Sequence, residues 1–419
     1  MTRPAEITGL ADLFGPEARA DPYPVYAQLR ATMPVWQPMP GLLVLSRHRD
    51  CAAVLRDQRF GHAEGGEMIE QRRRRLGAFG GDGDHEQPPV RSFLGLNPPD
   101  HTRLRRLVSR SFTPRHVDEL RPRMQSLTDE LLGRIGERET VDVVEMLASP
   151  LPVGVISELL GVPLEDRHKL VGWSHALAKG LDPAFLVTED ERRAQSRARD
   201  EFAAYLIELI EERRRSPGPD LLSDLVVAQE VSRAQGDGRS DKSLTMVELI
   251  ATCILLLIAG HETTTSLIAT GLLGLLRHPE QLRRLREDPE LFPGAVEELL
   301  RFDAPVQVTM RSALADATWA GVEAPKGTFV ILLLGSANRD PAAHADPDRL
   351  DVSRTPRAHL AFGQGIHFCL GAPLARLEAQ IALQTLLARF DGISLAGEPE
   401  WKDTSVLHGV RHLDVSLSR

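Results

Sequence analysis

The sequence predicts a mainly α-helical fold with minor β-structure, organised as one large domain over residues 1–419. Apolar residues recur with helical spacing over most of the chain, and the stretches with strand character are short. No internal repeat, low-complexity tract or flexible linker divides the sequence. One domain is therefore the simplest organisation, although 419 residues could form two or three domains of about 150 residues each.

Capping and turn residues delimit the expected helices and strands. Asp21 and Pro22 are typical of a helix start, and this helix ends before Pro34. Further helical segments are expected over residues 49–55, 101–136, 150–160, 164–179, 190–215 and 370–390. Short strands are expected over residues 41–46, 306–313, 317–319 and 328–334, and a coil over residues 338–359.

The longest predicted helix covers residues 245–276 and ends before His278. Its most apolar part, residues 249–260, is shorter than the roughly 18 to 20 apolar residues that cross a bilayer. It also runs directly into His261 and Glu262. We therefore expect a buried core helix and no membrane partner.

A long stretch rich in glycine and arginine, residues 59–99, shows no clear periodicity. Segments of this length without secondary structure are usually functional lids or disordered. We interpret this stretch as a surface loop that gates substrate access.

Composition and charge exclude several classes of protein. The net charge of −9 argues against a nucleic-acid partner. Cys51, Cys253 and Cys369 form no C-x-x-C pair, so neither a disulfide framework nor a zinc ribbon fits, and a reducing compartment is indicated. Residues 1–15 lack the pattern of a signal peptide, so a cytoplasmic location is expected.

Cys369 is the cysteine most suited to chemistry. It lies in the string F-G-Q-G-I-H-F-C-L-G at residues 362–371, a turn that leads into the last helix. Free backbone N–H groups and the helix dipole stabilise a thiolate at such a place, which suits an anionic ligand or a nucleophile. Phe362 offers an aromatic face near the sulfur. A large flat group could lie against the backbone at the glycines of this turn, which are Gly363, Gly365 and Gly371.

This string resembles the haem-binding signature F-G-x-G-x-H-x-C-x-G of the cytochrome P450 family at every position. The resemblance implies one haem b (iron protoporphyrin IX) per chain, bound by the loop that contains Phe362, Gly363 and Gly371. It places Cys369 as the iron ligand and His367 against a haem propionate. A dinucleotide-binding G-x-G-x-x-G does not fit, because Phe368 occupies the third glycine position.

A second string, E-L-L-R at residues 298–301, resembles the E-x-x-R motif of the same family. Glu298 and Arg301 stand three residues apart on one helical face, where they can form a bidentate pair. The resemblance implies a structural role for this pair, anchoring the coil that precedes the ligand loop. Arg354 is the expected third partner from that coil, although Leu350 stands where the family usually has an aromatic residue.

A third string, A-G-H-E-T at residues 259–263, interrupts the apolar long helix. A zinc protease motif H-E-x-x-H is excluded because residue 265 is threonine. The string resembles the family's oxygen-binding motif, in which Ala259 and Gly260 make room for O2. Glu262 and Thr263 would then form the catalytic acid–alcohol pair that delivers protons.

Basic residues complete the expected haem site. His101 and Arg105 resemble the family's H-x-x-x-R helix, and Arg311 follows the E-x-x-R helix on a strand. The resemblance implies that these three residues bind the haem propionates. An acidic electron-transfer protein is expected to dock on a positive face formed by Arg103, Arg106, Arg110 and Arg376.

The resemblance extends from residue 21 to the C-terminal strands and implies a soluble, bacterial-type monooxygenase. Such an enzyme inserts one oxygen atom from O2 into a lipophilic substrate, such as a polyketide, terpenoid, steroid or fatty acid. Because the sequence contains no flavin or iron–sulfur module, the expected electron donors are a ferredoxin and its NAD(P)H-dependent reductase. We expect a monomer. By resemblance, the substrate pocket is formed by residues 59–99, 179–188, 256, 259, 306–308 and 406–407.

Three alternatives remain open. A peroxygenase would use hydrogen peroxide directly and typically lacks the acid–alcohol pair. A haem-thiolate gas or redox sensor would need no proton relay. A haem-free helical binding protein would show no haem absorption.

Overall fold

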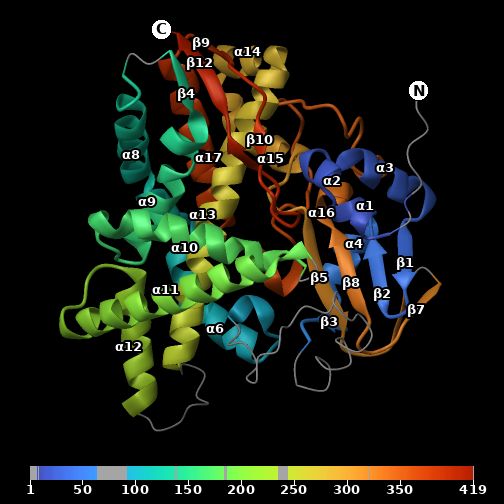
Figure 1. The fold of residues 1–419 in the computed structure, drawn as a ribbon, viewed down its shortest axis with the longest axis horizontal. Helices are drawn as coiled ribbons and strands as arrows, with labels where there is room; N and C mark the ends of the chain where they lie inside the picture. Colours follow the sequence, from blue (N-terminus) through green and yellow to red (C-terminus); the bar gives the residue numbers. More distant parts are fainter. Residues whose placement is uncertain are drawn as a thin grey trace.

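The computed structural model describes residues 7, 9–63, 92–136, 139–183, 186–234, 244–319 and 321–418. A large helical region and a smaller β-rich region lie side by side (Figure 1). Together with several short 3₁₀ and π turns, the α-helices of the described residues are α1 (Ala11–Phe14), α2 (Pro16–Ala20), α3 (Tyr23–Thr32), α4 (His48–Arg56), α6 (Asp100–Ser109), α7 (Pro114–Glu119), α8 (Arg121–Gly133), α9 (Pro150–Leu159), α10 (Arg167–Ala178), α11 (Glu189–Arg215), α12 (Leu221–Ala234), α13 (Met246–Arg277), α14 (Pro279–Glu287), α15 (Phe292–Phe302), α16 (Leu334–Asn338) and α17 (Ala372–Arg389). This architecture confirms the predicted mainly α-helical class with minor β-structure.

The strands form small sheets. They are β1 (Val35–Met39), β2 (Leu42–Leu45), β3 (Phe60–Gly61), β4 (Thr140–Asp142), β5 (Val308–Ala313), β6 (Ala317–Trp319), β7 (Val322–Ala324), β8 (Phe329–Leu333), β9 (Gly392–Leu395), β10 (Glu400–Trp401), β11 (Val410–His412) and β12 (Asp414–Ser418). The largest sheet has the order β1-β2-β8-β5-β3, with β2 and β8 parallel and the other pairs antiparallel.

The apolar run of β2 is explained by burial on both faces of this sheet. Leu43 and Leu45 pack into one hydrophobic cluster, whereas Leu42 and Val44 pack into another on the opposite face. Alternate residues of a strand point to opposite faces, so a strand covered on both sides has no polar alternation. The predicted strand over residues 41–46 is therefore confirmed.

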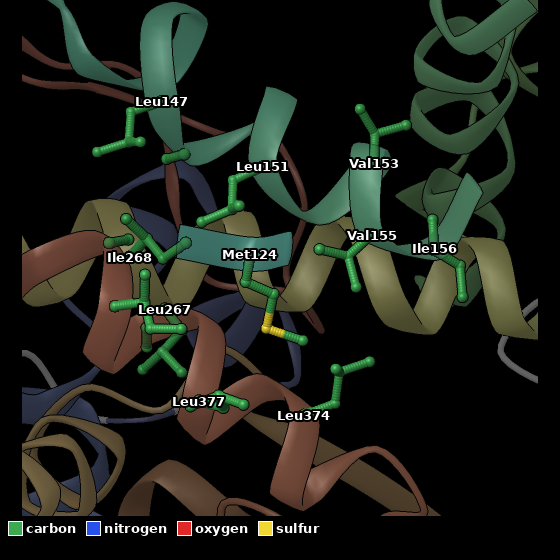
Figure 2. Close-up of a cluster of buried hydrophobic side chains, with 14 of the residues drawn as sticks. Met124, Leu147, Leu151, Val153, Val155, Ile156, Leu267, Ile268, Leu374 and Leu377 are labelled. Carbon is green, nitrogen blue, oxygen red and sulfur yellow. The ribbon is translucent and has the colours of Figure 1, made fainter. Parts of the chain in front are cut away.

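The long helix α13 starts and ends where capping residues predict. Thr245 and Glu248 form a reciprocal capping box, and the helix ends before His278 and Pro279. By length and composition α13 could cross a membrane. It instead packs against α9, α10, α11, α15 and α17 in the interior. Figure 2 shows Leu267 and Ile268 of α13 close to Met124 of α8, Leu151 of α9 and Leu377 of α17.

Two expectations about local structure need correction. Residues 59–99 are not wholly a loop, because β3 pairs with β5 and residues 93–95 form a 3₁₀ turn. The central part of the expected gate, residues 64–91, lies outside the described residues. The first predicted helix starts one residue later than expected, with Pro22 as its N-cap. Asp21 still contributes, because its Oδ1 accepts a hydrogen bond from the Tyr23 N–H at 3.2 Å.

Candidate haem site

The thiol of Cys369 is held at the start of α17 by a tight loop. The Cys369 N–H donates to the carbonyl of Phe362 at 2.9 Å, which closes the turn. Gly363 and Gly365 have φ values of 64° and 73°, a left-handed conformation that favours glycine. A Cβ on Gly365 would also lie 2.2 Å from the carbonyl oxygen of Leu55 at the end of α4. The loop therefore requires glycine at position 365 for both reasons.

The electrostatics of Cys369 differ from the sequence expectation. Burial raises the pKa of its thiol, although the Gly371 N–H, Arg105 and Arg376 act in the opposite direction. The stabilising groups expected at a helix N-terminus are present, but desolvation outweighs them. A bound cation at the sulfur would reverse this balance, because a thiol that coordinates a metal ion is deprotonated.

Four basic side chains gather next to the cysteine loop. The rings of His101 on α6 and His367 lie 4.3 Å apart, and neither ring has a hydrogen-bond partner within the described part of the chain. Burial lowers the pKa of both histidines, and the charges of Arg105 and Arg311 lower it further. Burial also lowers the pKa of Arg311 on β5 to about 10.

His101, Arg105, Arg311 and His367 together have the chemistry of an anion-binding site. Among the described residues, the rings of His101 and His367 have no hydrogen-bond partner, and Arg311 donates to the Thr309 hydroxyl and the Met310 carbonyl of its own strand. Buried cations and donors without an anion are costly, and they suit a ligand that brings its own negative charge. Two propionate groups of a haem whose iron meets Cys369 would supply that charge. The residues present therefore fit the group.

His62 is a neighbour of this cluster that the sequence did not reveal. Its ring lies 4.8 Å from that of His367 in a T-shaped arrangement. Asn97 holds the His62 backbone by accepting from its N–H at 2.9 Å and donating to its carbonyl at 2.7 Å. No local sequence pattern signals this residue, because its place depends on the pairing of β3 with β5.

The E-x-x-R pair behaves as predicted. Arg301 donates from Nε to Oε2 of Glu298 at 2.7 Å and from Nη2 to Oε1 at 2.8 Å, and both side chains are almost fully buried. Arg354 joins the same carboxylate, with its Nε 3.0 Å from Oε1. The structure thus brings all three residues together. The aliphatic Leu350 of the same coil is also buried.

The acid and alcohol of the long helix do not form a direct pair. Thr263 donates from its hydroxyl to the Ala259 carbonyl at 2.7 Å. The carboxylate of Glu262 instead meets Lys402 at 2.7 Å and His175 at 2.8 Å. Successive helix residues are about 100° apart, which explains why the two side chains point in different directions. Lys402 and His175 are partners that the sequence did not reveal.

Ala259 and Gly260 have different surroundings. Ala259 is exposed although it lies in the middle of a core helix, as expected for a residue beside a space that a bound group fills. A Cβ on Gly260 would meet Ile156 of α9 at 3.4 Å, so this glycine faces the neighbouring helix.

Two of the four arginines of the expected positive face form ion pairs. Arg103 is paired with Glu248 and Asp100. Arg376 is paired with Glu297 and lies over the ring of Phe362 at 4.6 Å. Arg106 and Arg110 are exposed.

The family model for cytochrome P450 matches residues 82–408. The chain belongs to the cytochrome P450 family. It is 43% identical over 337 residues to 6-deoxyerythronolide B hydroxylase of Saccharopolyspora erythraea, an alignment that covers 78% of this chain and 80% of the relative. It is 40% identical over 413 residues to vitamin D(3) 25-hydroxylase of Pseudonocardia autotrophica, with 97% and 96% of the two chains covered.

The comparison with solved structures agrees with the assignment of this chain to the cytochrome P450 family. The ligand-free crystal structure of CYP164A2 from Mycobacterium smegmatis superposes with a TM-score of 0.87 at 43% identity, covering 97% of this chain and 99% of that one. This cytochrome P450 is a monooxygenase that binds one haem b per chain.

Proposed function

We propose that this cytochrome P450 hydroxylates or epoxidises a lipophilic small molecule of secondary metabolism in the cytoplasm. A ferredoxin and its NAD(P)H-dependent reductase supply two electrons, so that substrate, O2, two electrons and two protons give the oxygenated product and one water. The names of the relatives support a lipophilic substrate, since they include a hydroxylase of 6-deoxyerythronolide B and one of vitamin D(3). The chain acts as a monomeric, single haem domain.

The observation that carries the proposal is the buried basic cluster beside Cys369. His101, Arg105, Arg311 and His367 would hold the two propionates, and the Cys369 sulfur would hold the iron. Bound in this way, haem supplies the activation of O2, which a thiolate ligand favours by donating electron density. Glu298, Arg301 and Arg354 keep the coil before the ligand loop in place.

The remaining steps are performed by the chain's own residues. Ala259 leaves space beside the haem face of α13, and Thr263 presents a hydroxyl on the same helical face, four residues on. Glu262 supplies protons to that side from the interior of the protein. Leu256 on α13 and the β-bridged residues Val306 and Leu407 orient the substrate through aliphatic side chains.

Reconstitution with a bacterial ferredoxin and reductase tests this proposal. A panel of macrolides, steroids and fatty acids is first screened for the spectral change that follows displacement of the iron-bound water. A responding compound should then be oxygenated only when NAD(P)H and both redox proteins are present. Equal turnover with hydrogen peroxide alone would indicate a peroxygenase, and binding without turnover under either condition would favour a sensor.

Replacing Thr263 with alanine should uncouple the reaction. Without the hydroxyl, proton delivery beside the haem is impaired, and we expect a several-fold smaller ratio of product to NAD(P)H consumed and more hydrogen peroxide. General acid–base contributions of about 10²–10⁴-fold set the upper range of the effect. Thr263→Ser, which keeps the hydroxyl, is the matched control. An unchanged product ratio in Thr263→Ala would contradict the proposed role.

A further inference from the structure

A cavity of about 1120 Å³ lies on the side of α13 where Glu262 points. Residues of α8, α9, α10 and α13 line it, together with the turn at residues 402–404. Its charged side chains are largely paired, for example Arg134 with Glu130 and His412 with Asp142. Such a mixed and compensated lining favours water over a charged ligand.

Glu262 is one of the residues that line this cavity. Its side chain is 2% exposed, and each carboxylate oxygen has a basic partner: Oε2 lies 2.7 Å from Lys402 Nζ and Oε1 lies 2.8 Å from His175 Nδ1. His175 is 55% exposed and so connects the buried carboxylate with the solvent-accessible side. The hydroxyl of Thr265 also lines the cavity and is buried with no hydrogen-bond partner within the described ranges. A buried hydroxyl of this kind is a place for an ordered water molecule.

The turn that carries Lys402 is firmly attached to the end of α10. Lys179 donates to the Asp403 carbonyl at 2.8 Å. Asp182 accepts from the N–H groups of Ser405 and Val406, each at 2.9 Å. Lys402 also donates to the Ser266 hydroxyl at 3.2 Å. The turn therefore holds the Lys402 ammonium group in place beside Glu262.

We propose that Lys402 is a positioning residue for proton delivery: it holds the Glu262 carboxylate on the cavity side of α13, where cavity water supplies a proton. The carboxylate takes one proton from a hydronium ion of the cavity water, which leaves a neutral water molecule, and then passes the proton to the Thr263 side, so it is ionised again at the end of each transfer. After each proton transfer, Lys402 returns the Glu262 carboxylate to the cavity side of α13. This inference rests on the proposed role of Glu262 and Thr263.

The charges around Glu262 agree with a carboxylate held on the cavity side of α13. Burial opposes ionisation of Glu262, but the hydrogen bond from His175 and the charge of Lys402 outweigh it and hold its pKa well below its usual range. Burial lowers the pKa of His261 to about 4, so this histidine is neutral at physiological pH. Lys402 is thus the fixed positive charge that faces Glu262. Its removal should raise the pKa of the carboxyl.

Variants at position 402 test the inference in the haem-loaded enzyme. Lys402→Gln should give a several-fold smaller ratio of product to NAD(P)H and a larger solvent deuterium isotope effect on kcat, with the substrate KM unchanged. Lys402→Arg, which keeps the charge, should restore most of the coupling. Lys169→Gln is the matched control, because Lys169 is an exposed lysine of α10 that pairs with Asp166. This variant should behave as the unmodified protein.

A double variant separates this inference from the proposed function. Glu262→Gln should itself uncouple the reaction, and adding Lys402→Gln to it should cause no further loss. Full coupling in Glu262→Gln would refute the proposed role of Glu262. Uncoupling in Glu262→Gln together with wild-type coupling and isotope effect in Lys402→Gln would overturn the present inference alone.

The pH dependence of Tm gives a readout independent of turnover. In the unmodified protein, the stabilisation from Glu262 is present above the unfolded pKa of about 4.3 and is lost only as the pH falls through the lower folded pKa. In Lys402→Gln the buried carboxylate lacks its cation, so its charge is destabilising at neutral pH and is relieved by protonation. The Tm deficit should therefore be larger at pH 7.5 than at pH 5, and the Glu262→Gln background should remove this difference. A deficit that does not change with pH would overturn the inference.

If Lys402→Gln does not accumulate as folded protein, Lys402→His carries the same test. An imidazole with a pKa near about 6.5 is charged at about pH 6 and neutral at about pH 8. Coupling should then fall between these pH values more steeply than in the unmodified enzyme. An identical pH profile would overturn the inference.

Discussion

Replacing Arg301 with leucine is expected to destabilise the protein severely and to abolish haem retention. Arg301 donates from Nη1 to the carbonyls of Asn338 at 3.0 Å and Pro347 at 2.7 Å, in addition to its pair with Glu298. The variant leaves the Glu298 carboxylate buried, with Arg354 as its remaining charged partner. Breaking a buried ion pair in this way costs about 3–5 kcal/mol, a large share of the roughly 5–15 kcal/mol that stabilises a typical protein.

Thermal unfolding and the haem-to-protein ratio measure this effect. The matched control is Arg284→Leu, which removes a partly exposed arginine that contacts Asp351 and Ser353 of the same coil. An exposed pair contributes about 0–1 kcal/mol, so this control should keep its haem. An Arg301→Leu protein with the Tm and haem content of the unmodified chain would show that the pair does not anchor the coil.

Replacing Cys369 with serine is expected to remove monooxygenase activity to below detection while leaving the polypeptide folded. The loop is closed by the backbone bond between residues 369 and 362, which serine can also form. An alcohol at this position does not provide a thiolate, so the electron donation that favours O–O cleavage is lost. Product formation and circular dichroism measure the two parts of this expectation.

Cys253→Ala is the matched control for this substitution. Cys253 is fully buried in α13, and burial raises the pKa of its thiol to about 12, so it is an inert core residue. This variant should keep both activity and haem. Activity that survives in Cys369→Ser and disappears in Cys253→Ala would contradict the assignment of Cys369 as the iron ligand.

Local signals predicted much of the fold. The predicted start of the long helix at residue 245 lies within one residue of the start of α13, and the predicted strand at residues 317–319 coincides with β6. These features depend on residues a few positions apart, which the sequence shows directly. The helix α12 was not predicted, because its amphipathic pattern is only moderate. The residues that follow it, 235–243, lie outside the described part of the chain.

The site was predicted less completely, because much of it depends on contacts across the fold. The cysteine loop and E-x-x-R are local motifs, and both are placed as expected. Lys402 lies 140 residues from its partner Glu262, and no local pattern links the two. The separation of Glu262 from Thr263 could have been foreseen from the helical angle alone. The net rise in the pKa of the Cys369 thiol could not, since it depends on burial.

The most direct test of Cys369 as the haem ligand is the absorption spectrum of the reduced protein under carbon monoxide. The unmodified chain should bind one haem and show the red-shifted Soret band after which the family is named, and Cys369→Ser should lack that band. A Soret band that stays in place in Cys369→Ser, or a purified chain that shows none after haem is supplied, would contradict the assignment.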